Sequence, residues 1–463
     1  MLSCPQLRLQ EPNQALNPKI FLSVKNSMHR LTLFCLLWLS SVIGSAQLPA
    51  KTDLVIYDRP NWNSYTYNFP ILGGVQVREN DEIVIRFDSA NSNKINDDFY
   101  VEEYQQVVLS SQDQGTTWNR IQPGWPHNMP FKLSNGVLVD MVYPIRLKPP
   151  QEQEQRLVKL GIGHIWNDRC RMFWDFWPQG MAAKMKEQGF HVWDLKVGAT
   201  ADDTYLPNGT VATYAPTSFI CRLSQDGGKS WRDSQAFDGT PYGHLVCMFS
   251  GSAVLSDDTI LIPAYGILKS ALEKKNQVFV LRSTDGGQSF TQHFIPGKSY
   301  NESTIISHPS GVTLAVLRSV TGPIFISHST DQGVTWSEPK NTGFAGSPLH
   351  AICLRSGTIV CSYADRWKSG SFRLTISTDE GKSWHVEHTK VLHGNLPKPH
   401  TKLSGPGQWL GGTGMAQLSD GRVFVFYSVP DVRKLTELAA GQTVKGHSYV
   451  AGNIVTEAYL LDH

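Results

Sequence analysis

One octapeptide recurs five times along this chain, each time after a short run of apolar or β-branched residues. The copies read SQDQGTTW (111–118), SQDGGKSW (224–231), STDGGQSF (283–290), STDQGVTW (329–336) and STDEGKSW (377–384). The preceding runs are typical of β-strands. Within the octapeptide, Asp accepts hydrogen bonds from downstream backbone N–H groups, and Gly adopts a backbone conformation that a Cβ disfavours. We interpret it as a hairpin turn with a structural Asp, because a calcium loop would need several oxygen ligands.

The spacing of the copies predicts an all-β, six-bladed β-propeller. The last four start at 224, 283, 329 and 377, and a repeat of about 40–50 residues built from short strands is typical of propeller blades. The interval from 111 to 224 is about twice as long, which predicts one blade without the octapeptide there. Strand-like sequences at 52–59 and 453–462 can share one blade and so close the ring, which removes exposed sheet edges.

The N-terminal region predicts export. From Met28 the sequence MHRLTLFCLLWLSSVIGSA has a basic start, an apolar core and a small-residue end, as in a signal peptide cleaved after Ala46. The alternative is a membrane anchor, but the apolar core is shorter than the roughly 20 residues of a spanning helix. We therefore divide the chain into a mis-assigned or unstructured extension (1–27), a signal peptide (28–46) and the propeller (47–463). The mature protein is expected to be secreted or periplasmic, with no membrane span.

Composition excludes several other classes of protein. Lys and Arg total 42 against 40 Asp and Glu, which argues against nucleic acid or an anionic membrane as the main partner. Of seven Cys, five follow the predicted cleavage point, and this odd, sparse set is not a disulfide framework. Cys353 and Cys361 flank a turn, so that a disulfide between them and two free thiols both remain open. No Cys/His cluster has zinc spacing, and we expect no metal and no cofactor.

Two segments depart from the strand pattern. Residues 160–195 are rich in aromatic side chains and include a predicted short helix at 179–189. They can form a packed insertion, which we favour, or a sugar-stacking wall. Residues 393–409 are rich in turn-forming residues and are expected to form a long loop on one face of the ring.

Three charged residues are not explained by the hairpin pattern. Glu302 precedes one predicted strand, Arg318 ends the next, and Arg366 occupies the position of Arg318 one blade later. If the blades are related by rotation, both Arg emerge on one face near the central channel, close to Glu302. Guanidinium groups suit a substrate carboxylate, and a carboxylate among them can act as base, nucleophile or polariser. A structural ion-pair network lining the channel is the alternative.

The octapeptide is the Asp-box, or BNR repeat, and over most of 60–430 the chain resembles the sialidase (neuraminidase) superfamily. The resemblance implies a six-bladed propeller that hydrolyses terminal sialic acids, although Asp-boxes also occur in propellers that are not enzymes. It implies a substrate carboxylate held by three Arg, an Asp acid/base, and a Tyr nucleophile assisted by a Glu. Glu302 in YNEST resembles that Glu, and Arg318 and Arg366 resemble the second and third Arg.

The remaining roles are less well matched. The acid/base is expected at Asp97 or Asp98 in DSANSNKINDDFY, with Asp88 a weaker candidate and solvated loop carboxylates the alternative. Asn68, in YNFP, stands where the family has its first Arg, and Met415 stands at our best match for the Tyr. With both departures, hydrolysis would need Glu302 together with Asp97 or Asp98.

Other polar side chains complete the candidate set. His244 and His350 precede strands at similar points of two blades and can serve as rim or proton-transfer residues, although a structural histidine is favoured for each. Tyr300, Tyr242 and Tyr265 are further hydroxyls that the sequence does not rank.

The sequence thus predicts a secreted, monomeric, sialidase-type exo-glycosidase that acts on a glycan or glycoconjugate ending in an acidic sugar. Two alternatives remain open. One is a propeller that binds glycans without catalysis, and the other is a hydrolase or lyase for another acidic polysaccharide.

Overall fold

The computed structural model describes most of the chain after residue 48. The described residues are 49–58, 65–78, 80–95, 98–121, 129–142, 163–167, 172–176, 191–193, 212–214, 220–235, 237, 239, 241–268, 270–273, 275–366, 368–394, 412–430 and 448–462. The chain divides into two compact units, Met1–Pro49 and Ala50–His463, and every element below lies in the second. The predicted signal peptide and the extension before it lie outside the described residues, so export remains a prediction.

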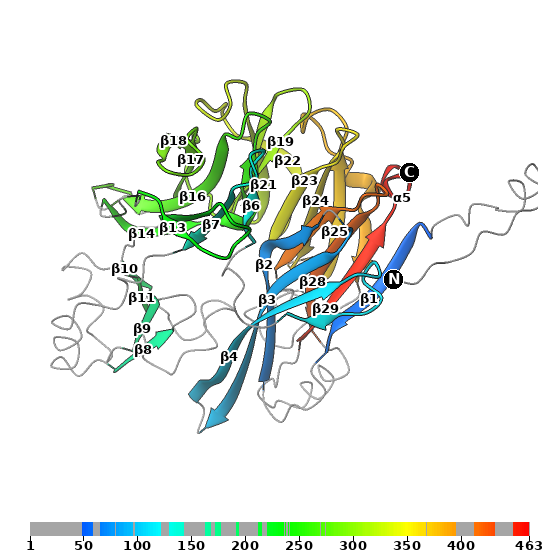
Figure 1. Cartoon of the computed structure of the whole chain (residues 1–463), viewed down its shortest axis with the longest axis horizontal. Coiled ribbons are helices and arrows are strands. Elements are labelled where there is room, and N and C mark those ends of the chain that lie inside the picture. The colour runs from blue at the N-terminus through cyan, green and yellow to red at the C-terminus, as the bar shows by residue number, and fades with distance from the viewer. Residues whose placement is uncertain are drawn as a thin grey trace, which may run out of the picture. The chain divides into compact units, whose positions relative to one another are not determined.

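The fold is an all-β six-bladed β-propeller, as predicted (Figure 1). Each blade is an antiparallel sheet whose first strand in chain order is the inner one, except that the chain's N-terminal strand is the outer strand of the last blade. Blade 1 contains β2 (Tyr65–Val77), β3 (Ile83–Ile95), β4 (Asp98–Ser111) and β5 (Asn119–Arg120). Blade 2 contains β6 (Phe131–Lys132), β7 (Leu138–Val142), β12 (Ile220–Ser224) and β13 (Arg232–Asp233). Blade 3 contains β14 (Tyr242–Cys247), β15 (Ala253–Val254), β16 (Ile260–Leu268), β17 (Gln277–Ser283) and β18 (Thr291–Phe294).

The remaining blades follow the same order. Blade 4 contains β19 (Thr304–Ser307), β20 (Thr313–Arg318), β21 (Pro323–Ser329) and β22 (Lys340–Ala345). Blade 5 contains β23 (Leu349–Cys353), β24 (Ile359–Asp365), β25 (Ser371–Ser377) and β26 (Lys390–His393). Blade 6 contains β27 (Thr413–Gln417), β28 (Val423–Pro430), β29 (Ser448–Val455) and, from the start of the chain, β1 (Lys51–Tyr57). A short helix, α5 (Glu457–Leu461), follows β29. In the described part of the chain, no helix is long and apolar enough to cross a membrane.

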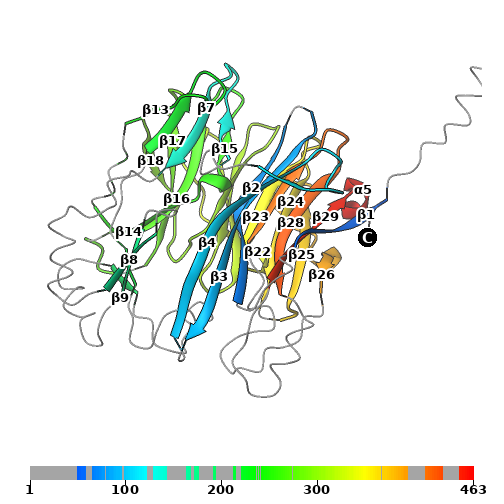
Figure 2. The ribbon, with the colours of Figure 1, turned by 60° about the horizontal axis from the view of Figure 1, so that its bottom comes forward.

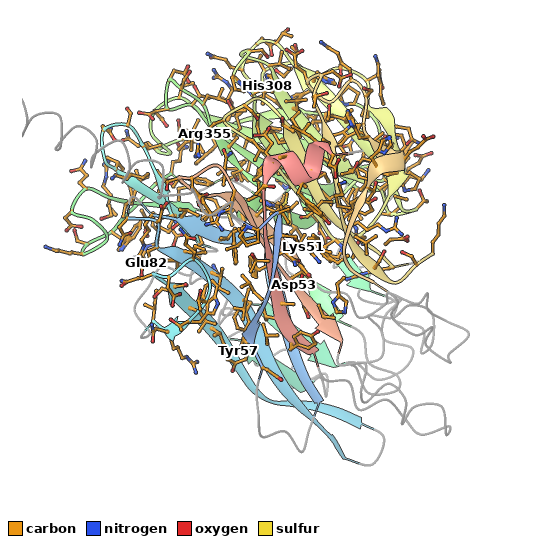
Figure 3. The ribbon with its side chains drawn as sticks, turned by 90° about the vertical axis from the view of Figure 1, so that its right-hand side faces the viewer. Lys51, Asp53, Tyr57, Glu82, His308 and Arg355 are labelled. Carbon is orange, nitrogen blue, oxygen red and sulfur yellow. The ribbon has the colours of Figure 1, made fainter. Side chains whose placement is uncertain are left out.

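The two ends of the chain close the ring in blade 6, as the terminal sequences predicted. β1 pairs antiparallel with β29, and Asp53 lies opposite Asn453. The buried Asn453 side chain donates to Asp53 Oδ1 at 2.5 Å and accepts from the Tyr427 hydroxyl at 2.6 Å. Lys51 Nζ lies 2.8 Å from the same Asp53 oxygen, and Figure 3 shows Lys51 and Asp53 along β1. Because one residue slip would move Asn453 away from Asp53, this network fixes the register of the closing strand.

Apolar clusters between adjacent blades form the core. They join blades 6 and 1, 2 and 3, 3 and 4, 4 and 5, and 5 and 6. Phe372 of blade 5 stacks on Tyr427 of blade 6 with ring centroids 4.2 Å apart. Burial of each large apolar side chain contributes about 1.5–3 kcal/mol, so the ring is stabilised mainly where blades face each other.

The Asp-boxes form the predicted hairpin turns between the third and fourth strands of blades 1 to 5. In the blade 4 copy, Asp331 Oδ1 accepts from the backbone N–H of Thr335 at 2.8 Å, and Oδ2 accepts from its hydroxyl at 2.6 Å. Gly333 has a φ of 84°. These hydrogen bonds lower the pKa of Asp331 to about 2. The same bonds recur at the Asp residues of the other copies, Asp113, Asp226, Asp285 and Asp379.

The blade without an Asp-box is not where the spacing placed it. It is blade 6, whereas the long interval from 111 to 224 lies within blades 1 and 2. Residues 143–219 are inserted between β7 and β12, and their described parts form two two-stranded ladders, β8 (Gly163–Asn167) with β9 (Met172–Phe176) and β10 (His191–Trp193) with β11 (Ala212–Tyr214). The predicted number of blades was right. The blade without an Asp-box was wrongly assigned to this interval, because the length of an interval does not distinguish an insertion from a blade. The helix predicted at 179–189 lies outside the described residues.

The cysteines of the described residues are free thiols. Cys353 and Cys361 lie on paired strands, but Cys353 faces Ile359 and Cys361 faces Ala351 across the hairpin. Burial raises the pKa of Cys353 to about 11. Of the two possibilities left open by the sequence, the structure has the free thiols.

Candidate functional site

The charged candidates Glu302, Arg318 and Arg366 lie at one end of the propeller, which we call the site face. It is the end at which the second strand of each blade connects to the third, as at the β3–β4 connection at the bottom of Figure 2. The opposite end, the turn face, carries the Asp-boxes and the turns between first and second strands. His308 and Arg355 mark it at the top of Figure 3. Because inner strands run from the site face to the turn face, residues just before them lie at the site face.

Glu302 and Arg318 form an ion pair at the site face. Arg318 ends β20, and its Nη1 donates to Glu302 Oε2 at 2.6 Å. The segment that carries Glu302 is held beside β20, because the Asn301 N–H donates to the Arg318 carbonyl at 3.0 Å. The side chains are 19% (Arg318) and 32% (Glu302) exposed. The pair is thus partly desolvated yet open to solvent, which suits a polar binding site.

Several polar atoms of this region have no hydrogen-bond partner within the described residues. These buried atoms are Arg318 Nε, Asn301 Oδ1 and, in blade 3, Ser252 Oγ. A buried polar group without a partner costs about 1–3 kcal/mol, so each is expected to bind water or a ligand group. Arg318 therefore retains a donor that Glu302 does not use.

Arg366 lies two residues beyond the position that corresponds to Arg318 in the neighbouring blade, because Thr313 pairs with Ser329 and Ile359 with the equivalent Ser377, which aligns Arg318 with Ala364. It follows Asp365, the last residue of β24, and is partly buried. Asp365 organises the turn after Arg366, since Oδ1 accepts from the Lys368 N–H at 3.0 Å and Oδ2 accepts from the Ser369 hydroxyl at 2.8 Å. The expectation that the two Arg occupy equivalent positions was therefore wrong by two residues, although both follow the second strand of their blade.

The acid/base candidates are placed only by their backbones. Asp98 opens β4 opposite Ile95, and Asp88 lies in β3 opposite Phe69. Asp97 lies outside the described residues, as do the side chains of Asp88 and Asp98. The role of Asp97 or Asp98 therefore stays a prediction. Asp98 begins the strand that follows the β3–β4 connection, at the site face.

The same limit applies to Asn68 and His244. Asn68 lies in β2 opposite Ser89, and His244 lies in β14 opposite Ile267, but neither side chain is among those described. Met415 is better defined: it lies in β27, is 3% exposed and packs in the apolar cluster between blades 5 and 6.

His350 lies inside the propeller, with its ring Nδ1 engaged by a backbone group. Nδ1 accepts from the Met415 N–H at 3.2 Å, and the side chain is buried. Burial lowers its pKa to about 4, so it is neutral near pH 7. This arrangement favours the structural alternative for His350 over contact with substrate.

The three tyrosines differ in their surroundings. Tyr242 and Tyr265 are buried in blade 3, whereas Tyr300, in the segment before β19, is partly buried. The backbone of Tyr300 forms an isolated antiparallel β-bridge with that of Ser319, and burial raises the pKa of the Tyr300 hydroxyl. Of the three tyrosines, Tyr300 is thus the one that is partly exposed, and it is also the one nearest to Glu302 in the sequence.

Sequence reasoning missed the short 3₁₀ helix η3 (Phe249–Gly251), which lies between β14 and β15 in the inner strand of blade 3. The visible signal was the FSGS sequence, in which a Gly interrupts a predicted strand. Among the described residues, no group of three His, Cys, Asp or Glu could hold a metal ion.

Comparison with known proteins agrees with this architecture. Residues 205–395 match the BNR repeat-like domain family. A protein of unknown function from Dyadobacter fermentans is 20% identical, with a TM-score of 0.51, and the match covers 88% of this chain and 99% of that one. An intramolecular trans-sialidase from Ruminococcus gnavus is 14% identical, with a TM-score of 0.49, over 85% of this chain and 95% of that one. The NanB sialidase from Streptococcus pneumoniae is 12% identical, with a TM-score of 0.48, over 88% and 71%. No curated protein matches the chain.

Proposed function

We propose that this protein is a secreted exo-acting glycoside hydrolase of sialidase type, which removes a terminal acidic sugar from glycans. The observation that carries the proposal is the Glu302–Arg318 pair, 2.6 Å apart and partly exposed at the site face, with a second Arg just after the second strand of the next blade. Resemblance of the Asp-box sequence and of the fold to sialidases supports the choice of reaction, but both concern the scaffold rather than the site.

Arg318 and Arg366 bind the carboxylate of the sugar. A guanidinium group offers several N–H donors in a plane that matches a carboxylate. Arg318 is oriented for this by Glu302, which occupies only Nη1 and leaves Nε without a partner in the described residues. The substrate carboxylate then shares Arg318 with Glu302, which offsets the repulsion between the two anions.

Hydrolysis uses Glu302 and a carboxylic acid from the β3–β4 connection, Asp97 or Asp98. The acid gives its proton to the glycosidic oxygen as the bond to the anomeric carbon breaks. Water adds to the anomeric carbon and loses a proton to Glu302. Met415 is buried in the core, so the side chain at position 415 takes no part in this reaction.

A fluorogenic sialoside tests the reaction. Wild-type protein is expected to release the fluorophore, and Glu302→Gln, which preserves size and hydrogen bonding, is expected to lower kcat by a factor of about 10²–10⁴. Arg355→Lys is the matched control, because Arg355 lies at the turn face and binds the Leu418 carbonyl at 2.7 Å. Equal turnover by wild type and Glu302→Gln would contradict the proposal.

A glycan-binding propeller without catalysis is the second candidate. It is favoured by the burial of Met415, because a nucleophile is missing there, and by the engagement of Glu302 with Arg318. In that case the sialoside is bound but not cleaved, and binding is lost in Arg318→Ala. A product that absorbs in the ultraviolet from a uronate-containing glycan would instead mark a lyase.

A further inference from the structure

The strand register of blade 4 places Glu302 opposite Arg318. Within β19 and β20, Thr304 pairs with Val316. Continued by two residues towards the site face, the same register sets Glu302 against Arg318. Residues directly opposite each other in an antiparallel pair have side chains on the same face of the sheet, which agrees with the 2.6 Å contact between the two charged groups.

The register changes immediately before Glu302. Tyr300 forms an antiparallel bridge with Ser319, and between this bridge and the pairing of β19 with β20, three residues lie opposite two. This is a β-bulge. If the register of the bridge continued, Asn301 would lie opposite Arg318, and Glu302 would lie on the other face of the sheet. The extra residue therefore allows the Glu302 side chain to meet Arg318.

Two hydrogen bonds of Asn301 hold the bulge. Its N–H donates to the Arg318 carbonyl at 3.0 Å, and its carbonyl accepts from the Ser303 hydroxyl at 2.5 Å. Ser303 is 2% exposed. Because the first bond ties the bulge to β20 and the second spans Glu302, the backbone of Glu302 is fixed on both sides.

Gly251 of η3 supports the bulge from blade 3. A Cβ built on Gly251 would lie 2.6 Å from the Ser303 carbonyl oxygen and 3.3 Å from Thr304 Cα. Both contacts involve backbone, so neither can be relieved by rotating a side chain. Glycine at this position thus lets blade 3 pack directly on the residue that closes the bulge.

We propose that Ser303 is a positioning residue for Glu302: its hydroxyl closes the bulge that turns the Glu302 carboxylate towards Arg318. Ser303 is buried and donates its hydroxyl to the main chain, so it acts through Glu302 and not on the substrate. The structural part of the proposal concerns only these contacts, whereas the expected effect on turnover rests on the proposed function.

Hydrogen–deuterium exchange of the full chain, resolved to single amides, tests the bulge without any substrate. In Ser303→Ala the Asn301 carbonyl loses its donor, and we expect the Asn301 amide to exchange about tenfold faster. The amides of Ser299 and Val320 are internal controls, because they donate to the Asn276 and Ser299 carbonyls outside the bulge. They are expected to exchange at the wild-type rate. Unchanged exchange at Asn301, or an equal rise at both control amides, would overturn the proposal.

Further variants separate the hydroxyl of Ser303 from its shape. Ser303→Thr and Ser303→Val introduce side chains of the same shape, of which only Thr can donate a hydrogen bond. The Asn301 amide is expected to exchange about tenfold faster in the Val variant, and equal rates would contradict the proposal. Ser307→Ala, at the exposed end of β19, is the matched control and is expected to leave Asn301 unchanged. Should the Ser303 variants fail to fold, Gly251→Ala displaces the Ser303 carbonyl and is expected to raise exchange at Asn301, and an unchanged rate there would equally count against the bulge.

Turnover of double variants separates positioning from a purely structural role. If the wild type hydrolyses a sialoside, Ser303→Ala is expected to lower kcat about tenfold and to leave KM within about twofold. In the Glu302→Gln background, Ser303→Ala is expected to change kcat little, because the group that it positions is already lost. An equal loss in both backgrounds would overturn the role through Glu302. If the wild type hydrolyses no sialoside, the proposed function fails while the exchange result still decides whether Ser303 closes the bulge.

Discussion

Asp258 of blade 3 holds Ser134 of blade 2 through both oxygens of its carboxylate. Oδ1 accepts from the Ser134 N–H at 2.9 Å, and Oδ2 accepts from the Ser134 hydroxyl. Asp258 has a φ of 64°, a left-handed conformation that is filled by glycine in four equivalent turns. Asp81, with a φ of 59°, holds Ser419 of blade 6 in the same way. A strained backbone position is thus used twice to join neighbouring blades at the turn face.

Replacement of Asp258 separates this contact from the backbone strain. Asp258→Ala loses both hydrogen bonds and keeps the left-handed strain, so we expect a loss of about 1–3 kcal/mol in the free energy of unfolding. Asp258→Gly loses the same bonds but relieves roughly 1–2 kcal/mol of strain, so it is expected to be the more stable variant. Urea denaturation of both variants measures the difference. An Ala variant at least as stable as the Gly variant would contradict this account.

Asn453 is predicted to be essential for ring closure. Asn453→Leu keeps the volume but leaves the Tyr427 hydroxyl and the Asp53 carboxylate without the amide, and we expect a loss of about 2–4 kcal/mol. Limited proteolysis is expected to cut near β1 sooner in this variant, because β1 is an outer strand whose strand partner among the described residues is β29. Thr52→Ala, next to Asp53, is a control with no expected change in the rate of cleavage.

The free energy of unfolding is predicted to fall as the pH is lowered, because of His350. Its pKa is lowered by burial from 6.5 to about 4 in the folded protein. Between these values the unfolded chain binds a proton that the folded protein does not bind. The contribution is therefore complete above pH 6.5, is lost as the pH falls towards 4, and amounts to a few kcal/mol at most. In His350→Gln, thermal denaturation is expected to show a smaller loss of stability over this range, and an identical loss would refute the assignment.

The blade 4 Asp-box provides a prediction about local structure. Asp331→Asn retains the hydrogen bond from the Thr335 N–H but weakens it, whereas Asp331→Ala removes the acceptor. The side chain lies at the surface, so the effects are expected to be modest, with Ala the less stable and roughly 1 kcal/mol lost. Urea denaturation compares the two, and equal stability of Ala and wild type would show that the turn does not need its carboxylate.

The sequence predicted the repeated elements well because their structure is local. Each Asp-box turn is built from hydrogen bonds within eight residues, so its pattern is visible in one short string. Glu302 and Arg318 were also paired correctly in blade 4, since Glu302 precedes the first strand of that blade and Arg318 ends the second. The insertion at 143–219 was misread as a blade because spacing reports length and not pairing.

The contacts of His350 were beyond reach for a related reason. Met415, whose N–H donates to His350 Nδ1, lies 65 residues away along the chain, so this partner leaves no mark near His350 in the sequence. Only the closed ring brings them together. The reasoning from rotation of equivalent blades locates strand ends but does not reveal contacts between side chains and neighbouring blades.

Calorimetric titration with an acidic sugar tests the central claim, that Arg318 and Arg366 bind a sugar carboxylate at the site face. N-acetylneuraminic acid is expected to bind wild-type protein, while its methyl ester, which lacks the negative charge, is expected to bind roughly 10–100-fold more weakly. Arg318→Ala is expected to abolish that preference, and Arg355→Lys at the turn face is expected to preserve it. Equal binding of acid and ester by the wild type, or a preference that survives in Arg318→Ala, would contradict the claim.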